Sequence, residues 1–108
     1  MTAYLISICR SVSDRGRLED YWAHVAPSFE GFDAKPLVAY APFQVLEGDD
    51  DAKGVVLFEF SSMEAAKRWY FSDAYQEVKQ RRLGAAEFDL ILVEGELTPA
   101  VERMPDTT

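Results

Sequence analysis

An arginine and a tyrosine are the side chains of this sequence best suited to binding a small anion. Arg82 falls seven residues after Tyr75, and this spacing places both on one face of a predicted helix, together with Phe71 and Val78. A guanidinium among apolar groups needs a partner, because an unpaired buried charge is costly. That partner can be a ligand carboxylate held by two hydrogen bonds, a protein carboxylate in a structural ion pair, or water reached by a snorkelling side chain.

Two further residues are candidates for acid–base chemistry. Glu47 closes the second predicted strand and can serve as a general base or as the partner of Arg82. It can equally be a strand-end carboxylate before a turn. His24, the only histidine, can act as an acid, a base or a single axial haem ligand, or can be a surface residue without chemistry. The candidate catalytic residues are therefore Arg82, Tyr75, His24 and Glu47.

Neither a metal nor a cofactor is predicted. A zinc site needs more nitrogen or sulfur ligands than His24 and the single Cys9 supply. The acidic run at residues 49–51 lacks the spacing and the closing glutamate of a calcium-binding EF-hand loop, and it is typical of a solvated turn. Cys9 lies within a predicted strand and is interpreted as a buried apolar residue.

Aromatic residues surround these candidates along the chain. At their spacing they are typical of a core, but core residues also form the walls of a pocket between helices and sheet. Trp22 belongs to this aromatic set. The residues predicted to contact a ligand are Tyr21, Trp69, Tyr70, Tyr75 and Arg82.

The apolar pattern of the first half of the chain predicts a strand and then a helix. Residues 4–9 alternate in the manner of a strand. After a cap at Ser13 or Asp14, apolar residues recur at helical spacing up to Phe29, and Pro27 is expected to end or kink this helix. The stripe consists of Leu18, Tyr21, Trp22, Val25 and Phe29.

The second half predicts three strands and an interrupted helix. Residues 37–47 and 55–60 form a hairpin, with Val38 and Tyr40 on one face and a break in the ladder at Pro42. Ser61 and Glu64 form a capping box, and Ser72-Asp73 forms a second cap at which the helix breaks and resumes. Gly84 is expected to stop it, and residues 88–93 form the fourth strand.

This β-α-β-β-α-β order predicts an α+β, ferredoxin-like fold with an antiparallel sheet and two helices on one face. The strands are apolar on both faces, although two helices can cover only one. The simplest cover for the other face is a second copy of the chain, so we expect a symmetric homodimer. We expect one domain over residues 1–96 and a tail over residues 97–108, ordered only if it docks on something.

Charge and cysteine content limit the partners. The 108 residues carry a formal net charge of −8 and no basic stripe, so neither nucleic acid nor an anionic membrane is an expected partner. No apolar run is long enough to cross a membrane. A single cysteine excludes an intrachain disulfide, which agrees with a cytoplasmic location.

Several motifs, in this order and spacing, resemble the domain-of-unknown-function family numbered 1330 of the dimeric α+β barrel superfamily. They span about residues 4–95 and comprise Val45-Leu46-Glu47-Gly48, Phe58-Glu59-Phe60-Ser61-Ser62, Glu64-Ala65-Ala66, Trp69-Tyr70, Ser72-Asp73-Ala74-Tyr75-Gln76, Arg82, Ala85-Ala86 and Leu92-Val93-Glu94-Gly95. The resemblance implies the fold, the dimer and a cavity between sheet and helices. It marks Glu47, Trp69, Tyr70, Tyr75 and Arg82 as positions of interest. The segment at residues 32–36 departs from the family pattern, so a shared ligand does not follow.

Two functional hypotheses emerge from the sequence. In the first, the protein binds a small apolar or carboxylated molecule between the sheet and the helices. It would then be a binding protein or a cofactor-independent enzyme, with Arg82 holding the anion and Tyr75 or His24 donating a proton. In the alternative, the chain is a dimerisation module without chemistry, in which Arg82 pairs with a carboxylate and locks helix to sheet. An open cavity on which Arg82 and Tyr75 converge would favour the first hypothesis.

Overall fold

The computed structural model describes residues 1–49, 51–97 and 100–104. Its strands and helices follow the β-α-β-β-α-β order, with a 3-10 helix η1 after the first helix and the second helix in two pieces. Strands and helices have the bounds β1 (Ala3–Val12), α1 (Arg15–Val25), η1 (Ala26–Phe29), β2 (Ala34–Ala39), β3 (Gly54–Phe60), α2 (Met63–Tyr70), α3 (Asp73–Lys79), β4 (Ala86–Glu94) and α4 (Ala100–Arg103).

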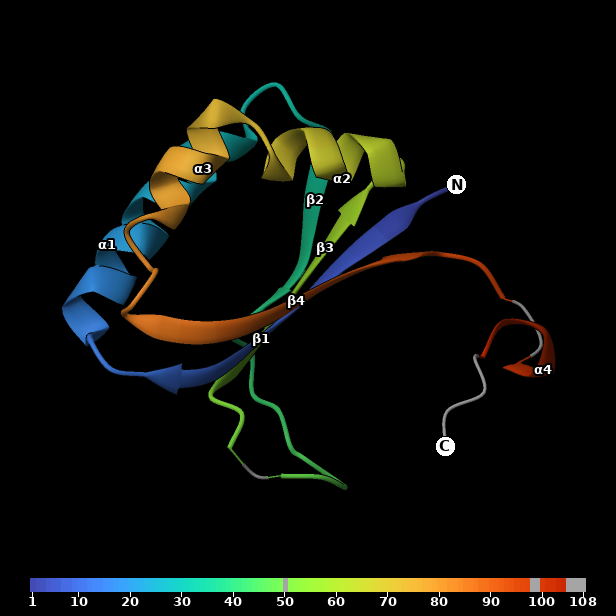
Figure 1. Ribbon diagram of the computed structural model, residues 1–108, viewed down its shortest axis with the longest axis horizontal. Coiled ribbons are helices and arrows are strands. Elements are labelled where there is room, and N and C mark those ends of the chain that lie inside the picture. The colour runs from blue at the N-terminus through green and yellow to red at the C-terminus, as the bar shows by residue number, and fades with distance from the viewer. Residues whose placement is uncertain (50, 98–99, 105–108) are drawn as a thin grey trace.

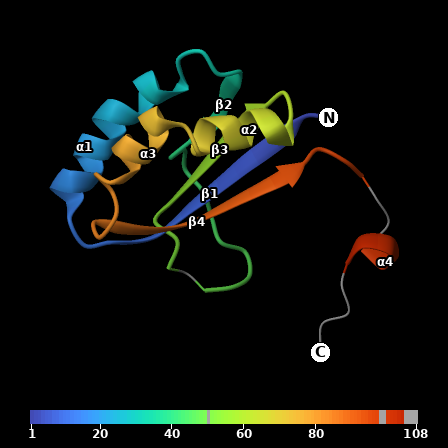
Figure 2. The same ribbon diagram turned by 45° about the horizontal axis from the view of Figure 1, so that its top comes forward.

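The four strands form one antiparallel sheet in the order β2-β3-β1-β4. Helices α1, α2 and α3 all lie on the same side of the sheet, as both views show (Figures 1 and 2). This arrangement confirms the predicted α+β, ferredoxin-like fold. The chain between β2 and β3 extends past the end of the sheet, away from these helices (Figure 1).

The first helix is capped and ended as its sequence predicts. The Asp14 side chain accepts a hydrogen bond from the backbone N–H of Arg17 at the start of α1. The α-helix ends at Val25, and Pro27 lies in the first turn of η1. There its missing N–H removes no helical hydrogen bond. The chain therefore continues as a tighter turn that carries Ser28 and Phe29 to the inner face of the sheet.

The predicted interruption of the second helix is confirmed. Ser72 has an extended backbone, and its hydroxyl accepts a hydrogen bond from the N–H of Tyr75, so α3 begins afresh after α2. The predicted cap of α2 was one residue early. Ser62, and not Ser61, caps this helix by accepting from the N–H of Ala65.

The prediction for the second strand was wrong in its bounds. Strand β2 ends at Ala39, because Tyr40 takes a left-handed backbone (φ 56°) and turns the chain out of the ladder. Val38 and Tyr40 consequently do not share a face. Residues 45–47 lie in the connection to β3, so Glu47 does not close a strand. A register shift does occur in β2, but it lies between Pro36 and Val38.

The two faces of the sheet differ in burial. Toward the helices lies the main buried cluster, which consists of Leu5, Phe60, Ala66, Trp69 and Tyr75. On the outer face apolar residues also predominate, but none is fully buried, and Ile91 remains 52% exposed. These outer residues are Tyr4, Ile6, Ile8, Val38, Val55, Leu57, Ile91 and Val93.

The chain after β4 contains the four-residue helix α4. Leu97, Val101 and Met104 expose most of their surface. Residues 98–99 and 105–108 of the predicted tail, and Asp50 of the acidic run, lie outside the described residues. None of the helices within the described ranges is long and apolar enough to cross a membrane.

Candidate functional site

A cavity of about 270 Å³ lies between the inner face of the sheet and the helices. Its sheet side is almost wholly apolar, with Leu5, Phe58 and Leu90 among the lining residues. Helices α1, α2 and α3 contribute Tyr21, Trp69 and Tyr75. The turn after α3 adds Arg82, the only charged residue of the described lining.

Arg82 is buried in the lining of this cavity, with 6% of its surface exposed. It lies in the turn between α3 and β4, not on the helix itself as its spacing suggested. Phe71, which was expected on the same face, is 70% exposed. The Arg82 guanidinium lies between two aromatic rings, 5.6 Å from the centre of Tyr21 and 5.3 Å from that of Phe88. Such stacking stabilises a desolvated cation.

Among the described residues, the side-chain hydrogen-bond partner of Arg82 is a phenol and not a carboxylate. Its Nη2 donates to the Tyr75 hydroxyl over 3.2 Å. The ion pairs found among the described residues involve Arg10, Arg15, His24 and Arg81, and none involves Arg82. Burial disfavours the charged form, but the neighbouring Tyr75 and Tyr21 oxygens outweigh it and leave the pKa of Arg82 raised. The site therefore holds a buried positive charge that no carboxylate of the described chain neutralises.

Tyr75 links Arg82 to Tyr21 through two hydrogen bonds in the cavity lining. The two tyrosine hydroxyl oxygens are 3.0 Å apart and share a hydrogen bond. Tyr75 is fully buried, and the two rings meet edge to face. Burial, reinforced by the neighbouring Tyr75, raises the pKa of Tyr21 well above its ordinary value. Tyr21 is thus a neutral hydrogen-bond donor at physiological pH.

Trp69 forms a rigid wall of the cavity. Its ring is stacked on Phe29 at 4.6 Å between centres, and its Nε1 donates to the Ser28 hydroxyl over 3.2 Å. Ser28 is itself buried and donates to the carbonyl of Val25. Sequence reasoning missed Ser28, since a serine after a proline in a predicted helix end carries no sign of a buried role.

A second aromatic pair forms the more exposed part of the wall. The Nε1 of Trp22 donates to the Tyr40 hydroxyl over 3.0 Å. The Tyr40 ring lies on Gly54, where an added Cβ would come within 2.5 Å of a ring carbon. Tyr40 was not predicted as a site residue. Its position depends on its left-handed backbone and on the missing side chain of Gly54, and neither is visible in a pattern of apolar residues.

Three of the residues singled out from the sequence do not line this cavity. Glu47 is exposed in the β2–β3 connection and makes no ion pair with Arg82. Tyr70 borders a separate hollow of about 230 Å³ beside α2, where its hydroxyl accepts from Lys79 Nζ. His24 lies on the outer surface of α1.

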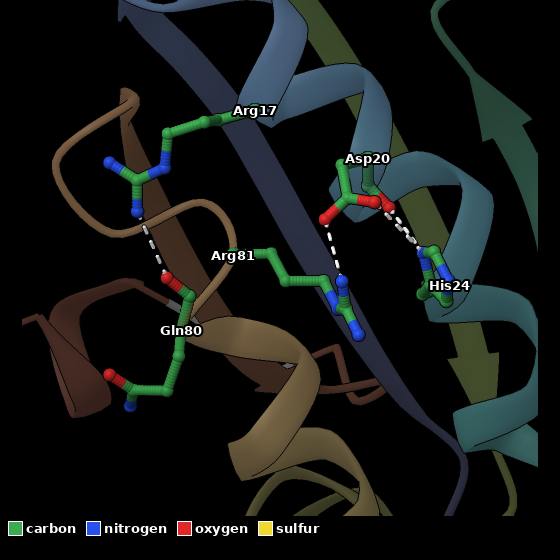
Figure 3. Close-up of polar contacts among 5 residues, drawn as sticks. All are labelled: Arg17, Asp20, His24, Gln80 and Arg81. Atoms are coloured by element: carbon green, nitrogen blue, oxygen red, sulfur yellow. Dashed lines mark hydrogen bonds and ion pairs between the residues drawn. The ribbon is translucent and has the colours of Figure 1, made fainter.

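The neighbours of His24 explain why it is not part of the cavity. Its Nδ1 is 2.8 Å from the backbone carbonyl oxygen of Asp20 and 3.3 Å from Oδ1 of the same residue. The other carboxylate oxygen of Asp20, Oδ2, accepts a hydrogen bond from Arg81 at 2.7 Å (Figure 3). Arg81 holds down the pKa of Asp20 by this hydrogen bond. Asp20, His24 and Arg81 thus form an exposed polar cluster that joins α1 to the turn after α3. In the same region, Arg17 binds the carbonyl of Gln80 (Figure 3).

The described part of the chain brings together no group of three histidine, cysteine, aspartate or glutamate residues able to hold a metal ion. Cys9 is buried, as predicted. Burial also raises the pKa of its thiol.

Comparison with known proteins assigns the chain to one family and finds solved structures with the same fold. The sequence model described as "Domain of unknown function (DUF1330)" matches residues 2–96. No protein of curated function matches the chain.

Solved structures share the architecture at low identity. A protein of unknown function from Rhodopseudomonas palustris is 20% identical, with 91% of this chain and 84% of that chain covered and a TM-score of 0.69. A hydroxynitrile lyase from Passiflora edulis is 11% identical, with 91% and 97% covered and a TM-score of 0.65. A dimeric ferredoxin-like protein of unknown function from Jannaschia sp. CCS1 is 11% identical, with 87% and 99% covered and a TM-score of 0.61. At these identities the likeness concerns the fold alone.

Proposed function

This chain belongs to the DUF1330 family of domains of unknown function, and we propose that it binds a small apolar molecule carrying one anionic group in the cavity between sheet and helices. The observation that carries the proposal is the buried guanidinium of Arg82 in the cavity lining, which pairs with no carboxylate of the described residues. A buried charge without a counter-charge destabilises the free protein. A ligand anion would remove that penalty on binding.

Cavity size and chemistry narrow the class of ligand. Its volume of about 270 Å³ lies just below the range of about 300–1,000 Å³ usual for drug-sized ligands. Apolar walls with a single cationic residue suit an aromatic or branched aliphatic acid with one carboxylate. Because Tyr75 and Tyr21 share one hydrogen bond, one of their two hydroxyls would remain to donate to the same anion, and Trp69 would pack against its apolar body.

The experiment compares ligand-induced stabilisation in two neighbouring arginine variants. Benzoate and phenylacetate serve as anionic probes and benzyl alcohol as the neutral probe, each followed by the shift in melting temperature. We expect the two acids, but not the alcohol, to stabilise the wild type. Arg82→Met should weaken binding of the acids at least about tenfold, the loss expected for one charge-assisted hydrogen bond.

Arg81→Met is the matched control, because Arg81 is the adjacent residue but binds Asp20 on the outer surface. It should leave the response to the acids intact. The proposal fails if neither acid stabilises the wild type, or if both variants respond to the acids as the wild type does.

The proposal leaves the reaction open. A neighbour named a hydroxynitrile lyase uses the same fold, but fold does not determine chemistry. If the protein is a cofactor-independent enzyme, Tyr75 and Arg82 are the candidates for contact with the reacting atoms. His24 and Glu47 lie away from the cavity, which weakens their case as acid or base.

We also propose that the protein is a symmetric homodimer of single-domain protomers spanning residues 1–96. The half-exposed apolar outer face of the sheet supports a second copy as its cover, and one structural neighbour is described as dimeric. The dimer accords with either hypothesis drawn from the sequence. What favours binding over a purely structural module is the absence of an ion pair at Arg82 among the described residues.

The free thiol of Cys9 supports a reducing, cytoplasmic location.

A further inference from the structure

The hydrogen bonds around Arg82 leave one phenolic proton without an acceptor among the residues that the structure describes. Tyr21 and Tyr75 share a single hydrogen bond, so one of their two hydroxyl protons is committed to it and the other is not. The Tyr75 oxygen already accepts from Arg82. Whichever tyrosine donates to the other, the pair therefore offers one free O–H donor. We call Tyr21, Tyr75 and Arg82 the donor cluster.

No basic group of the described lining opposes the donor cluster. Three tyrosines of the lining can titrate: Tyr21 lies on α1, Tyr75 lies on α3, and Tyr40 follows β2. The turn after α3 contributes Arg82, and the strands contribute only apolar residues and Ser7. Burial raises the pKa of Tyr40, as it does that of Tyr21. The described lining contains no carboxylate, histidine or lysine that could accept a proton or repel an anion.

Such an arrangement selects for negative charge on an oxygen atom. Several donors directed at one site in an apolar surrounding stabilise an oxyanion far more than the neutral hydroxyl from which it forms. The stabilisation does not require that the ligand be a carboxylic acid. An enol or a phenol, which is mostly neutral in water at physiological pH, would gain from the same donors once ionised.

We infer that the donor cluster holds its ligand through a single oxyanion, so that enols and phenols are taken up in their ionised form. This inference rests on the proposed function and extends its ligand class to weak oxygen acids. On binding, the O–H bond of the ligand breaks, its electron pair stays on the oxygen, and the proton passes to solvent, since no base of the described lining receives it. No oxidant or reductant takes part.

The test uses 4-nitrophenol, whose neutral and ionised forms absorb at different wavelengths and interconvert near neutral pH. The absorbance of the bound probe is titrated against pH for the wild type and three variants. We expect the ionised form to bind the wild type at least about tenfold more tightly than the neutral form. This preference lowers the apparent pKa of the bound probe by at least about one unit.

The variants separate the contributions of the donor cluster. Arg82→Met should abolish the preference for the ionised probe, and Tyr75→Phe should reduce it while leaving the cation in place. Arg81→Met should retain the full preference. A probe that binds the wild type with no change in its titration overturns the inference, as does an equal change in all variants.

The carboxylate probes distinguish this failure from failure of the proposed function. In one outcome, benzoate stabilises the protein while 4-nitrophenol either does not bind or titrates as it does in water. That result would support the proposed anion site and contradict only its extension to weak oxygen acids. If none of these probes binds, both proposals fail.

Discussion

At the scale of single residues, Arg82 decides between the two hypotheses drawn from the sequence. A guanidinium that locks helix to sheet would pair with a carboxylate, and removing one partner of such a buried pair costs about 3–5 kcal/mol. Arg82 instead lies between two rings and donates to Tyr75. These contacts offset most of the cost of burying the cation, so the remaining penalty in the ligand-free protein is small.

We therefore predict that Arg82→Met changes the free energy of unfolding of the ligand-free protein by no more than about 1 kcal/mol. Methionine keeps the apolar stem of the side chain and removes the buried charge. Chemical denaturation, with equal slopes for variant and wild type, provides the measurement. Arg81→Met should also cost less than about 1 kcal/mol, because it removes a partly exposed ion pair. A loss of several kcal/mol in Arg82→Met alone would support the structural module.

At the scale of elements, the break between α2 and α3 allows the two helices to take different directions, so that each places one aromatic side chain in the cavity lining. Trp69 projects from α2 and Tyr75 from α3, with ring centres 4.2 Å apart. The Ser72 hydroxyl accepts from the N–H of Tyr75 and donates to the carbonyl of Trp69 over 2.7 Å. One side chain thus ends the first helix and begins the second, and it fixes the turn that sets the Tyr75 ring against Trp69.

The two helix caps offer a matched pair of variants. Ser72→Ala and Ser62→Ala each remove one N-cap hydroxyl and should each lower the free energy of unfolding by about 1 kcal/mol. Only Ser72→Ala should also weaken the binding of benzoate, because only α3 carries Tyr75. Denaturation and calorimetric titration of both variants provide the comparison. Equal affinities in the two variants would contradict a role for the helix break in positioning the site.

At the scale of the whole molecule, the uncovered face of the sheet is the dominant feature. Ile6 lies at its centre, paired with Leu57 on one side and Ile91 on the other. All of the helices α1 to α3 lie on the opposite face (Figure 2). An apolar face of this kind gains free energy when another apolar surface removes it from water.

We predict that the protein sediments as a dimer at micromolar concentration and that Ile6→Glu converts it to a monomer. The new carboxylate would be buried without a partner in a sheet-on-sheet interface. Ala23→Glu is the control, since it adds the same charge on an exposed position of α1. Analytical ultracentrifugation measures both variants. A wild type that sediments as a monomer would refute the argument from the two-faced sheet.

The local signals of the sequence were sufficient for the fold. Alternation in β1, the apolar stripe of α1, the cap at Ser72 and the order of the elements all depend on neighbouring residues and short spacings. Those signals are carried by backbone hydrogen bonding and by side-chain periodicity, which act within a few residues. Predictions that depended on them alone were confirmed for the broken second helix but were wrong for the bounds of the second strand and for the cap at Ser61. Ser62 replaced Ser61 as a cap because both serines offer the same hydroxyl one residue apart.

The site required contacts between residues distant in the chain. The sequence by itself singled out Tyr21, Trp69, Tyr75 and Arg82, because a guanidinium among apolar groups needs a partner and core aromatic residues can also form the walls of a pocket. Only the tertiary structure decided that Arg82 meets a tyrosine and no carboxylate of the described residues. It also separated Glu47, His24 and Tyr70 from the cavity and brought Tyr40 to it. The physical reason is that the partner of a buried charge is determined by packing across the whole domain, and no local spacing encodes it.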